Sequence, residues 1–269
     1  MSAPHLKVVT STAKRPVIEI AGVSKTYRTQ DGDVPSLRPL DFSVGAAEFL
    51  VVVGPSGCGK STLLKLIAGL LPPSEGEIRV EGRVVTRPHA DVGIVFQSPL
   101  LLPWRSVFRN VLMPVEVKGL PRAEYAERAR ALLKMVGLAG FENKYPWQLS
   151  GGMQQRASIC RALVHDPKIV LMDEPFGALD AMTRERMNVE LQRIQRETGK
   201  TVLLITHSIP EAVFLADRVL VMSERPGTIA AIYDVTLPRP RSLDVLADPV
   251  FVQLTQTIRR HFDVQRDVG

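Results

Sequence analysis

The eight residues from Gly54 to Ser61 constrain the fold of this chain more than any other stretch. They read GPSGCGKS, and they stand between the apolar run FLVVV and the segment KSTLLKLIAGLL. An apolar strand, a glycine-rich turn and a helix start, in that order, wrap backbone N–H groups around a phosphate. The pattern predicts an α/β fold with a parallel sheet and a phosphate-binding loop at the end of one strand.

The chemistry of this loop points to a nucleoside triphosphate with Mg²⁺. Lys60 can reach the β- and γ-phosphates, and the Ser61 hydroxyl can ligate the metal ion. A chance glycine turn before a helix is the alternative, and the register of strand, loop and helix argues against it. The expected ATP-binding residues of the loop are Gly54, Pro55, Ser56, Gly57, Cys58, Gly59, Lys60, Ser61 and Thr62.

An acidic pair follows a second apolar strand. In KIVLMDEP, Asp173 and Glu174 stand at the strand end, where a carboxylate is costly without a partner such as a metal ion. We expect Asp173 to hold Mg²⁺ and Glu174 to polarise the attacking water. For this segment alone, an ordinary acidic exit from a strand is the alternative.

A histidine ends a third apolar strand, TVLLIT. From this position His207 can sense a γ-phosphate through a hydrogen bond, although on its own a structural histidine is the better interpretation. The other histidines have no comparable context. We interpret as structural or solvated His5, His89, His165 and His261.

A second anion-binding pattern lies in LSGGMQQR, at residues 149–156. Ser150, Gly151 and Gly152 at a helix start combine N–H groups, a hydroxyl and the helix dipole. A plain serine N-cap followed by flexible glycines is the alternative when the segment is viewed in isolation.

LSGGMQQR, with GPSGCGKS before it and LMDEP after it, resembles the motif set of the nucleotide-binding subunit of ABC transporters. The resemblance covers residues 17–225. It implies a P-loop NTPase (RecA-like) core with a parallel sheet, an N-terminal antiparallel β subdomain and an α-helical signature subdomain. The implied boundaries are a flexible leader at 1–16, an ATP-binding domain at 17–240 with its helical subdomain near 98–165, and a short C-terminal extension at 241–269.

The same resemblance assigns roles to single residues. Tyr27 matches the aromatic residue that stacks on adenine, and Gln97 matches the glutamine that contacts Mg²⁺ or the attacking water. Asp180 matches the D-loop aspartate. His207 matches the switch histidine, so the implied catalytic set is Glu174, His207 and Gln97, and the implied metal ligands are Ser61, Gln97 and Asp173.

A shared site between two subunits is also implied by the resemblance. Each ATP would lie between the phosphate loop of one subunit and the signature of the other, in a head-to-tail homodimer. The signature residues that would act on the second subunit are Ser150, Gly151, Gly152 and Gln154.

Hydrophobic periodicity predicts the remaining elements. The predicted strands are 17–27, 40–48, 168–173, 201–207 and 218–224. The predicted helices are 121–138, 152–165 and 183–199. The first helix carries on one face Ala126, Ala129, Leu132, Leu133 and Val136. The tail from Arg225 is proline-rich and then weakly helical.

Composition limits which binding partners and which cellular compartment fit this sequence. The net charge is +6 and the pI is near 9.5, but the arginines are spread along the chain, which argues against nucleic acid as a partner. Cys58 and Cys160 have no framework spacing, which fits a reducing cytoplasm. No uninterrupted apolar stretch approaches the ~18 residues of a membrane span. The resemblance to ABC transporter subunits implies a peripheral protein at the cytoplasmic face of the inner membrane.

The stretch VFQSPLLLPW, residues 95–104, begins as a strand and breaks at its prolines. One interpretation is a small satellite core that takes up Leu100 or Leu101. The other is a docking surface near Gln97–Trp104 for a coupling helix of transmembrane permease subunits. This stretch and RPGTIAAIYDVTLPRPR resemble the nitrate, sulfonate and taurine group of importers.

The expected function is therefore ATP binding and hydrolysis in an ABC importer. The subunit would power a separate permease for a small anion such as nitrate, an aliphatic sulfonate or taurine, delivered by an extracytoplasmic solute-binding protein. An ABC-type ATPase acting on nucleic acid or ribosomes is the alternative, but such proteins usually carry a long coiled-coil insertion or two cassettes. A P-loop kinase would give LSGGMQQR no role.

Overall fold

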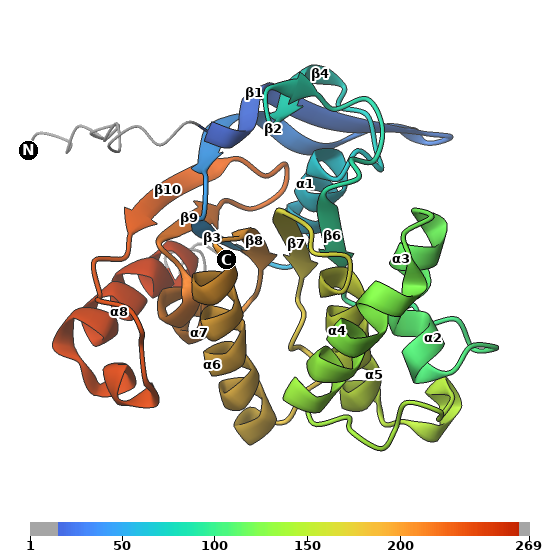
Figure 1. Cartoon of the computed structure of the whole chain (residues 1–269). Helices are drawn as coiled ribbons and strands as arrows, with labels where there is room; N and C mark the ends of the chain where they lie inside the picture. Colours follow the sequence, from blue (N-terminus) through green and yellow to red (C-terminus); the bar gives the residue numbers. More distant parts are fainter. Residues whose placement is uncertain (1–15, 264–269) are drawn as a thin grey trace, which may run out of the picture.

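The computed structural model describes residues 16–263, which form two sheets with helices between and around them (Figure 1). The predicted leader at 1–16 lies outside the described residues, apart from Pro16.

A six-stranded sheet forms the centre, in the order β10-β9-β3-β8-β7-β6. All of its neighbouring strands are parallel except β10 and β9. The strands are β3 (Phe49–Val53), β6 (Val92–Val95), β7 (Ile169–Asp173), β8 (Thr201–Ile205), β9 (Arg218–Met222) and β10 (Ile229–Asp234). The predicted α/β fold with a parallel sheet is confirmed.

Strand β3 is buried on both faces. Phe49, Val51 and Val53 belong to one apolar cluster, and Leu50 and Val52 belong to another. Alternate residues of a strand point to opposite faces, so a strand covered on both sides is apolar at every position. This explains the run FLVVV, and it holds the end of β3 in one place.

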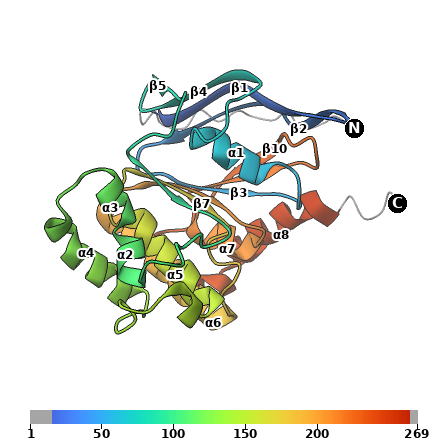
Figure 2. The ribbon, with the colours of Figure 1, turned by 90° about the vertical axis from the view of Figure 1, so that its right-hand side faces the viewer.

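An antiparallel sheet lies over the central one, and α1 (Lys60–Ile67) is packed between them (Figure 2). Its order is β2-β1-β4-β5. The strands are β1 (Pro16–Thr29), β2 (Gly32–Gly45), β4 (Glu75–Val80) and β5 (Arg83–Val84). The strand predicted at 40–48 is the end of a longer one. Strand β2 begins at Gly32 because it pairs with β1 back to the turn.

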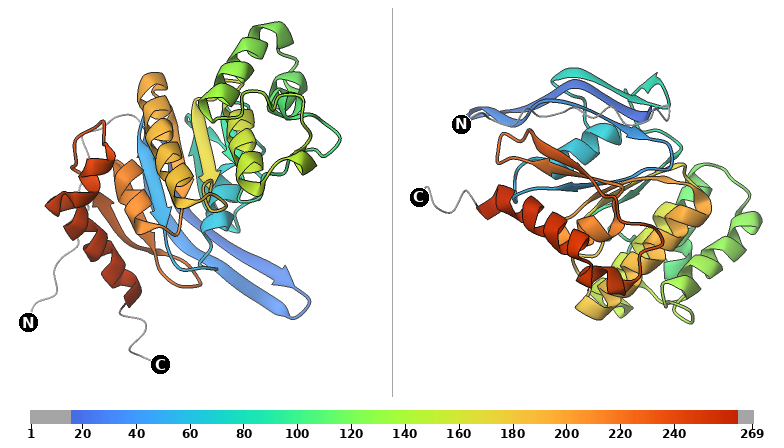
Figure 3. Two further views of the ribbon diagram at one scale, coloured as in Figure 1. Left: turned by 90° about the horizontal axis from the view of Figure 1, so that it is seen from below. Right: turned by 90° about the vertical axis from the view of Figure 1, so that its left-hand side faces the viewer.

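Helices cover the other face of the central sheet. Four of them gather at one end, beside β6 (Figures 1 and 3). They are α2 (Val107–Val111), α3 (Met113–Val117), α4 (Arg122–Met135) and α5 (Gly151–Leu163). Farther along lie α6 (Ala181–Thr198), α7 (Ile209–Leu215) and α8 (Pro249–Asp263). Among residues 16–263, no helix combines the length and apolar character needed to cross a membrane.

The predicted helices correspond to α4, α5 and α6. On α4, Ala129 and Leu133 are buried, whereas Ala126 and Leu132 are half-buried. The helix ends at Met135, and Gly137 follows in the left-handed region with φ 70°. The face predicted from the sequence is therefore the face that packs.

The tail after Arg225 is more ordered than its composition predicts. It adds β10 to the sheet edge and ends in α8, which buries Phe251 and Ile258. Before α8, the buried Arg241 donates to the carbonyl oxygens of Val213, Phe214 and Ala216. Helix C-termini leave carbonyls without partners, and here an arginine from the tail supplies them for α7.

His165 lies just after α5, and neither of its ring nitrogens has a hydrogen-bond partner. Burial, with Lys118 and Lys200 nearby, lowers its pKa to about 4, and Asp166 and Asp91 oppose this only partly. A histidine in the unfolded chain titrates near ~6.5. Between these two values the unfolded chain binds a proton that the folded chain does not, so the free energy of unfolding falls as the pH is lowered.

We predict that His165→Gln reduces this pH dependence. The wild-type protein should lose about 2 to 3 kcal/mol of stability between pH 7 and pH 4.5 through this residue, and the variant should not. Urea unfolding at both pH values measures the difference, with His89→Gln in a surface loop as the control. An unchanged difference in His165→Gln would rule out this contribution.

Candidate active site

The loop predicted to bind phosphate joins β3 to α1. Its turn uses glycine where the backbone requires it: Gly57 and Gly59 have φ of 77° and 104°. At Gly59 a Cβ atom would lie 2.6 Å from Leu37 of β2. Behind the loop, a Cβ atom at Gly227 would lie 2.0 Å from the carbonyl oxygen of Cys58. The loop is therefore held closely from both sides.

Lys60 is buried at the start of α1. Its ammonium group donates to the carbonyl oxygens of Gly54 and Pro55, each at 2.8 Å. The side chain thus folds back over the loop. Its positive charge lies near the N-terminus of α1. Phosphate oxygens are stronger acceptors for this ammonium group than neutral carbonyls.

Tyr27 of β1 reaches the first turn of α1. Its hydroxyl lies 3.2 Å from the Thr62 hydroxyl, which also accepts from Ser36 at 3.3 Å. The structure therefore brings the predicted adenine-stacking residue next to the phosphate loop.

Asp173 is the last residue of β7. Burial raises the pKa of its carboxyl group, while a hydrogen bond from the Ser61 side chain lowers it. The two predicted metal ligands therefore lie close to each other. A buried carboxylate beside a serine hydroxyl is a set of hard oxygen donors, which suits Mg²⁺.

Glu174 brings the predicted catalytic residues together. Its Oε2 atom lies 3.2 Å from Gln97 Nε2 and 3.3 Å from His207 Nδ1. These three residues follow β7, β6 and β8, and neighbouring parallel strands end at the same edge of a sheet. Glu174 has φ 45°, and its N–H donates to Ile205 of β8 at 2.9 Å. The strained backbone is consistent with a functional position.

The signature residues begin α5. Ser150 is the N-cap, and its Oγ accepts from the N–H of Met153 at 3.3 Å. Gln154 turns back and donates to the carbonyls of Pro146 and Leu149. Asp180 caps α6 in the same way, accepting from Thr183 at 2.9 Å, and these hydrogen bonds lower its pKa. The plain N-cap interpretation thus describes Ser150 within one subunit.

Comparison with known proteins decides the family. The family model described as "ABC transporter" matches residues 37–177, just over half of the chain. This chain belongs to the ABC transporter family. It binds ATP, and it is the ATP-hydrolysing subunit type of that family, as the resemblance in the sequence implied.

Several ABC ATP-binding proteins are similar over most of the chain. One from Methanocaldococcus jannaschii is 50% identical and aligns over 83% of this chain and 84% of its own length. The taurine import ATP-binding protein TauB of Rhizobium johnstonii is 48% identical, with 84% and 88% covered. TauB of Escherichia coli K12 is 43% identical, with 88% and 94% covered.

Solved structures show the same ATPase fold. The dimeric bacterial ABC transporter cassette MJ0796 superposes with a TM-score of 0.75 at 34% identity, over 82% of this chain and all of that one. A post-hydrolysis dimer of the same cassette, bound to ADP and phosphate, gives a TM-score of 0.74 at 32% identity. The P-loop NTPase core predicted from sequence is confirmed.

Several polar residues of this ABC ATPase were not singled out in the sequence. The buried Glu211 of α7 accepts from Thr206 at 2.8 Å, and burial raises its pKa. With the N-cap Ser208, it fixes the turn that carries His207. In a sequence, such residues can be noticed only as polar residues on a helix face that is expected to be buried.

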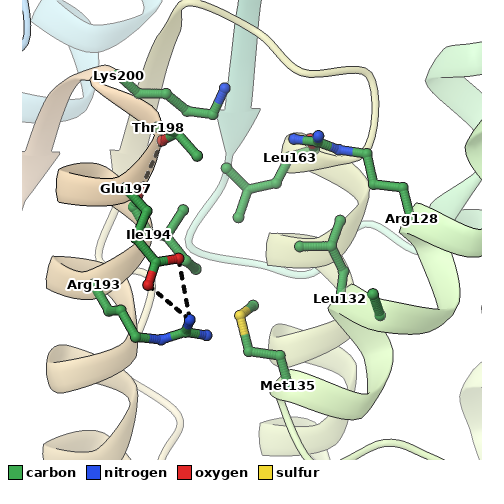
Figure 4. A pocket seen from close by; sticks show the side chains of 10 residues that line it. Arg128, Leu132, Met135, Leu163, Arg193, Ile194, Glu197, Thr198 and Lys200 are labelled. Atoms are coloured by element: carbon green, nitrogen blue, oxygen red, sulfur yellow. Dashed lines mark hydrogen bonds and ion pairs between the residues drawn. The ribbon is translucent and has the colours of Figure 1, made fainter.

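A pocket of about 260 Å³ lies apart from the nucleotide loop, between α4 and α6 (Figure 4). Its apolar lining includes Leu132, Met135 and Ile194. Its charged groups are already paired: Arg193 with Glu197, and Lys200 with Asp166. None of the residues predicted to bind ATP or Mg²⁺ lines this pocket.

We predict that Tyr27→Ala weakens ATP binding and that Tyr27→Phe does not. Loss of an aromatic ring stacked on a base costs about 1–3 kcal/mol, or about 5- to 150-fold in Kd. Isothermal titration with ATP in the presence of EDTA measures both variants. Equal losses in the two variants would assign the effect to the Tyr27–Thr62 hydrogen bond and not to stacking.

Proposed function

We propose that this chain powers an ABC importer for a small organic anion of the taurine type. The mutual approach of Gln97, Glu174 and His207 carries the hydrolytic part of the proposal. The names of the TauB relatives support the solute class. Other aliphatic sulfonates and nitrate remain within the same importer group.

The ATP would lie along the phosphate loop and the start of α1. Residues Gly54 to Thr62 bind its phosphates, with Lys60 leaving its carbonyl partners for the β- and γ-phosphate oxygens. Ser61, Asp173 and Gln97 hold Mg²⁺, which supplies neutralisation of phosphate charge when it is bound. Tyr27 stacks on the adenine.

Hydrolysis would be carried by Glu174. Its carboxylate accepts a proton from the attacking water, which Gln97 orients from the neighbouring strand end. His207 contacts the same carboxylate oxygen and senses the γ-phosphate. The three side chains come from three adjacent strands, so their spacing is set by the sheet.

The complete site would include a second copy of the chain. Ser150, Gly151 and Gly152 form a helix start that can bind the γ-phosphate of the partner's ATP, and Asp180 lies at another helix start. The dimeric form of the related cassette supports this arrangement. Gln154 would act indirectly, by holding the loop before Ser150.

Transmembrane permease subunits would dock at the loop of residues 97–104. Leu100 is 58% exposed and Trp104 is 71% exposed, whereas Leu101 is partly buried and packs against the apolar cluster that the sheet and the helices share. The satellite-core interpretation thus applies to Leu101 and is wrong for Leu100. An exposed apolar patch of this kind suits a coupling helix. The chain would then sit at the cytoplasmic face of the inner membrane.

The division of the chain follows from these roles. Residues 17–240 would be the ATP-binding domain, residues 98–165 its helical subdomain, and residues 241–269 a short extension. The solute-binding protein would act through the permease and would not contact this subunit.

We predict that Glu174→Gln binds ATP with near wild-type Kd and hydrolyses it at least about 100-fold more slowly, because general-base catalysis contributes about 10²- to 10⁴-fold. Phosphate release under saturating MgATP measures this rate. Glu185→Gln, an acidic residue of α6, is the matched control and should hydrolyse normally. Hydrolysis by Glu174→Gln within a few fold of wild type would overturn the assignment.

We also predict partial complementation between Ser150→Arg and Lys60→Ala subunits. Each variant alone has two defective sites, but a mixed dimer has one intact site and one doubly defective site. The mixture should therefore hydrolyse ATP faster than either variant alone and at no more than half the wild-type rate. Absence of any recovery would contradict a site shared between subunits.

A further inference from the structure

The loop of residues 97–104 is fixed by side chains from helices α5 and α2. Its backbone is irregular, and Leu100 adopts φ 47°, a conformation that is strained for a leucine. A loop without regular hydrogen bonding must find other partners for its buried peptide groups. Here these partners are a few polar side chains that the nucleotide chemistry does not use.

Arg161 holds the middle of the loop. It is buried on α5, and its guanidinium donates to the carbonyl oxygens of Pro99 and Leu100, each at 2.7 Å. Burial lowers its pKa, and no carboxylate of residues 16–263 forms an ion pair with it. A buried cation without a counter-ion is costly, so the two carbonyl bonds are the reason for its position.

Two amides fix the ends of the loop. Gln155 of α5 is fully buried and donates to the carbonyl of Phe96 at 3.0 Å. Asn110 of α2 is also fully buried, accepts from the N–H of Leu102 at 2.7 Å and donates to its carbonyl at 3.1 Å. The loop backbone is thus attached to the helices from Phe96 to Leu102.

Helix α5 therefore takes part in two features of the structure. At its start, Ser150 forms the signature turn, and along its length Gln155 and Arg161 hold the loop. The side chains of Leu100 and Trp104 remain exposed on that loop. The loop that carries Trp104 and the turn at Ser150 are thus linked through one helix and the hydrogen bonds of Gln155 and Arg161.

We propose that Arg161 is a positioning residue that makes the loop 97–104 and the start of α5 move as one body. The functional consequence rests on the proposed function: binding of the permease at Trp104 would shift the Ser150 turn relative to the ATP bound by the partner subunit. The attachment itself does not depend on that function: it rests on the carbonyl bonds of Arg161 in the middle of the loop, beside those of Gln155 and Asn110 at its ends.

Hydrogen exchange in the Glu174→Gln background tests the attachment. Peptides covering 98–106 and 149–156 are followed with and without MgATP. In the background variant, MgATP should slow exchange in both peptides. With Arg161→Met added, the loop peptide should exchange at least about tenfold faster and lose its response to MgATP, while peptide 149–156 keeps its response.

Arg128→Met is the matched control, because Arg128 also donates to a carbonyl of α5, at Leu163, but lies away from the loop. It should leave both responses intact. Arg161→Lys keeps the charge and replaces two hydrogen bonds by one, so it should give an intermediate loop rate, and it serves if Arg161→Met does not fold. A loop in Arg161→Met or Arg161→Lys that exchanges and responds as in the background would overturn the proposal.

The same experiment separates this proposal from the proposed function. If MgATP protects neither peptide even in Glu174→Gln, the shared site between subunits is wrong. The nucleotide-free exchange of the loop then decides the role of Arg161 by itself: faster exchange in Arg161→Met supports the attachment, and unchanged exchange refutes it.

Discussion

Strand β3 buries alternate residues against two different apolar clusters, and the proposed nucleotide site depends on the position this gives to Val53. Burial on both faces leaves the strand no freedom to slip, because a shift by one residue would exchange its two sets of side chains. The glycine turn that follows therefore has a fixed position at the end of the sheet. The loop needs this rigidity, since backbone N–H groups bind phosphate only if they converge on it.

The same sheet explains why residues far apart in sequence share one carboxylate. Gln97, Glu174 and His207 each follow a parallel strand, and the order β8-β7-β6 makes those strands direct neighbours. The lateral spacing of strands is about 4.7–4.9 Å, which lets long side chains from adjacent ends meet. The proposed hydrolytic group thus comes from a repeated local pattern, an apolar strand followed by a polar residue, and not from one continuous motif.

The sequence predicted these features because each motif coincides with its own strand or helix. The glycine turn, the strand ends and the helix starts are each encoded within one short segment. The parallel order of the strands then brings these segments to the same edge of the sheet. It did not predict the roles of Arg161, Asn110 or Arg241, because their acceptors are carbonyls of distant segments and carbonyls leave no trace in the side-chain pattern. Likewise, three leucines in one loop look alike in sequence, and only packing separates the partly buried Leu101 from the exposed Leu100.

The close contact between Gly227 and the carbonyl of Cys58 gives the nucleotide loop a neighbour from the far end of the domain. The N–H of Gly227 also donates to Ser36, and its carbonyl accepts from Arg38, so this one residue joins β2 to the back of the loop. Any side chain at position 227 must push the phosphate-binding backbone forward. Gly227 lies outside every recognised motif, yet it limits the shape of the phosphate-binding loop. A substitution at position 227 would therefore have the same effect as a substitution within the loop itself.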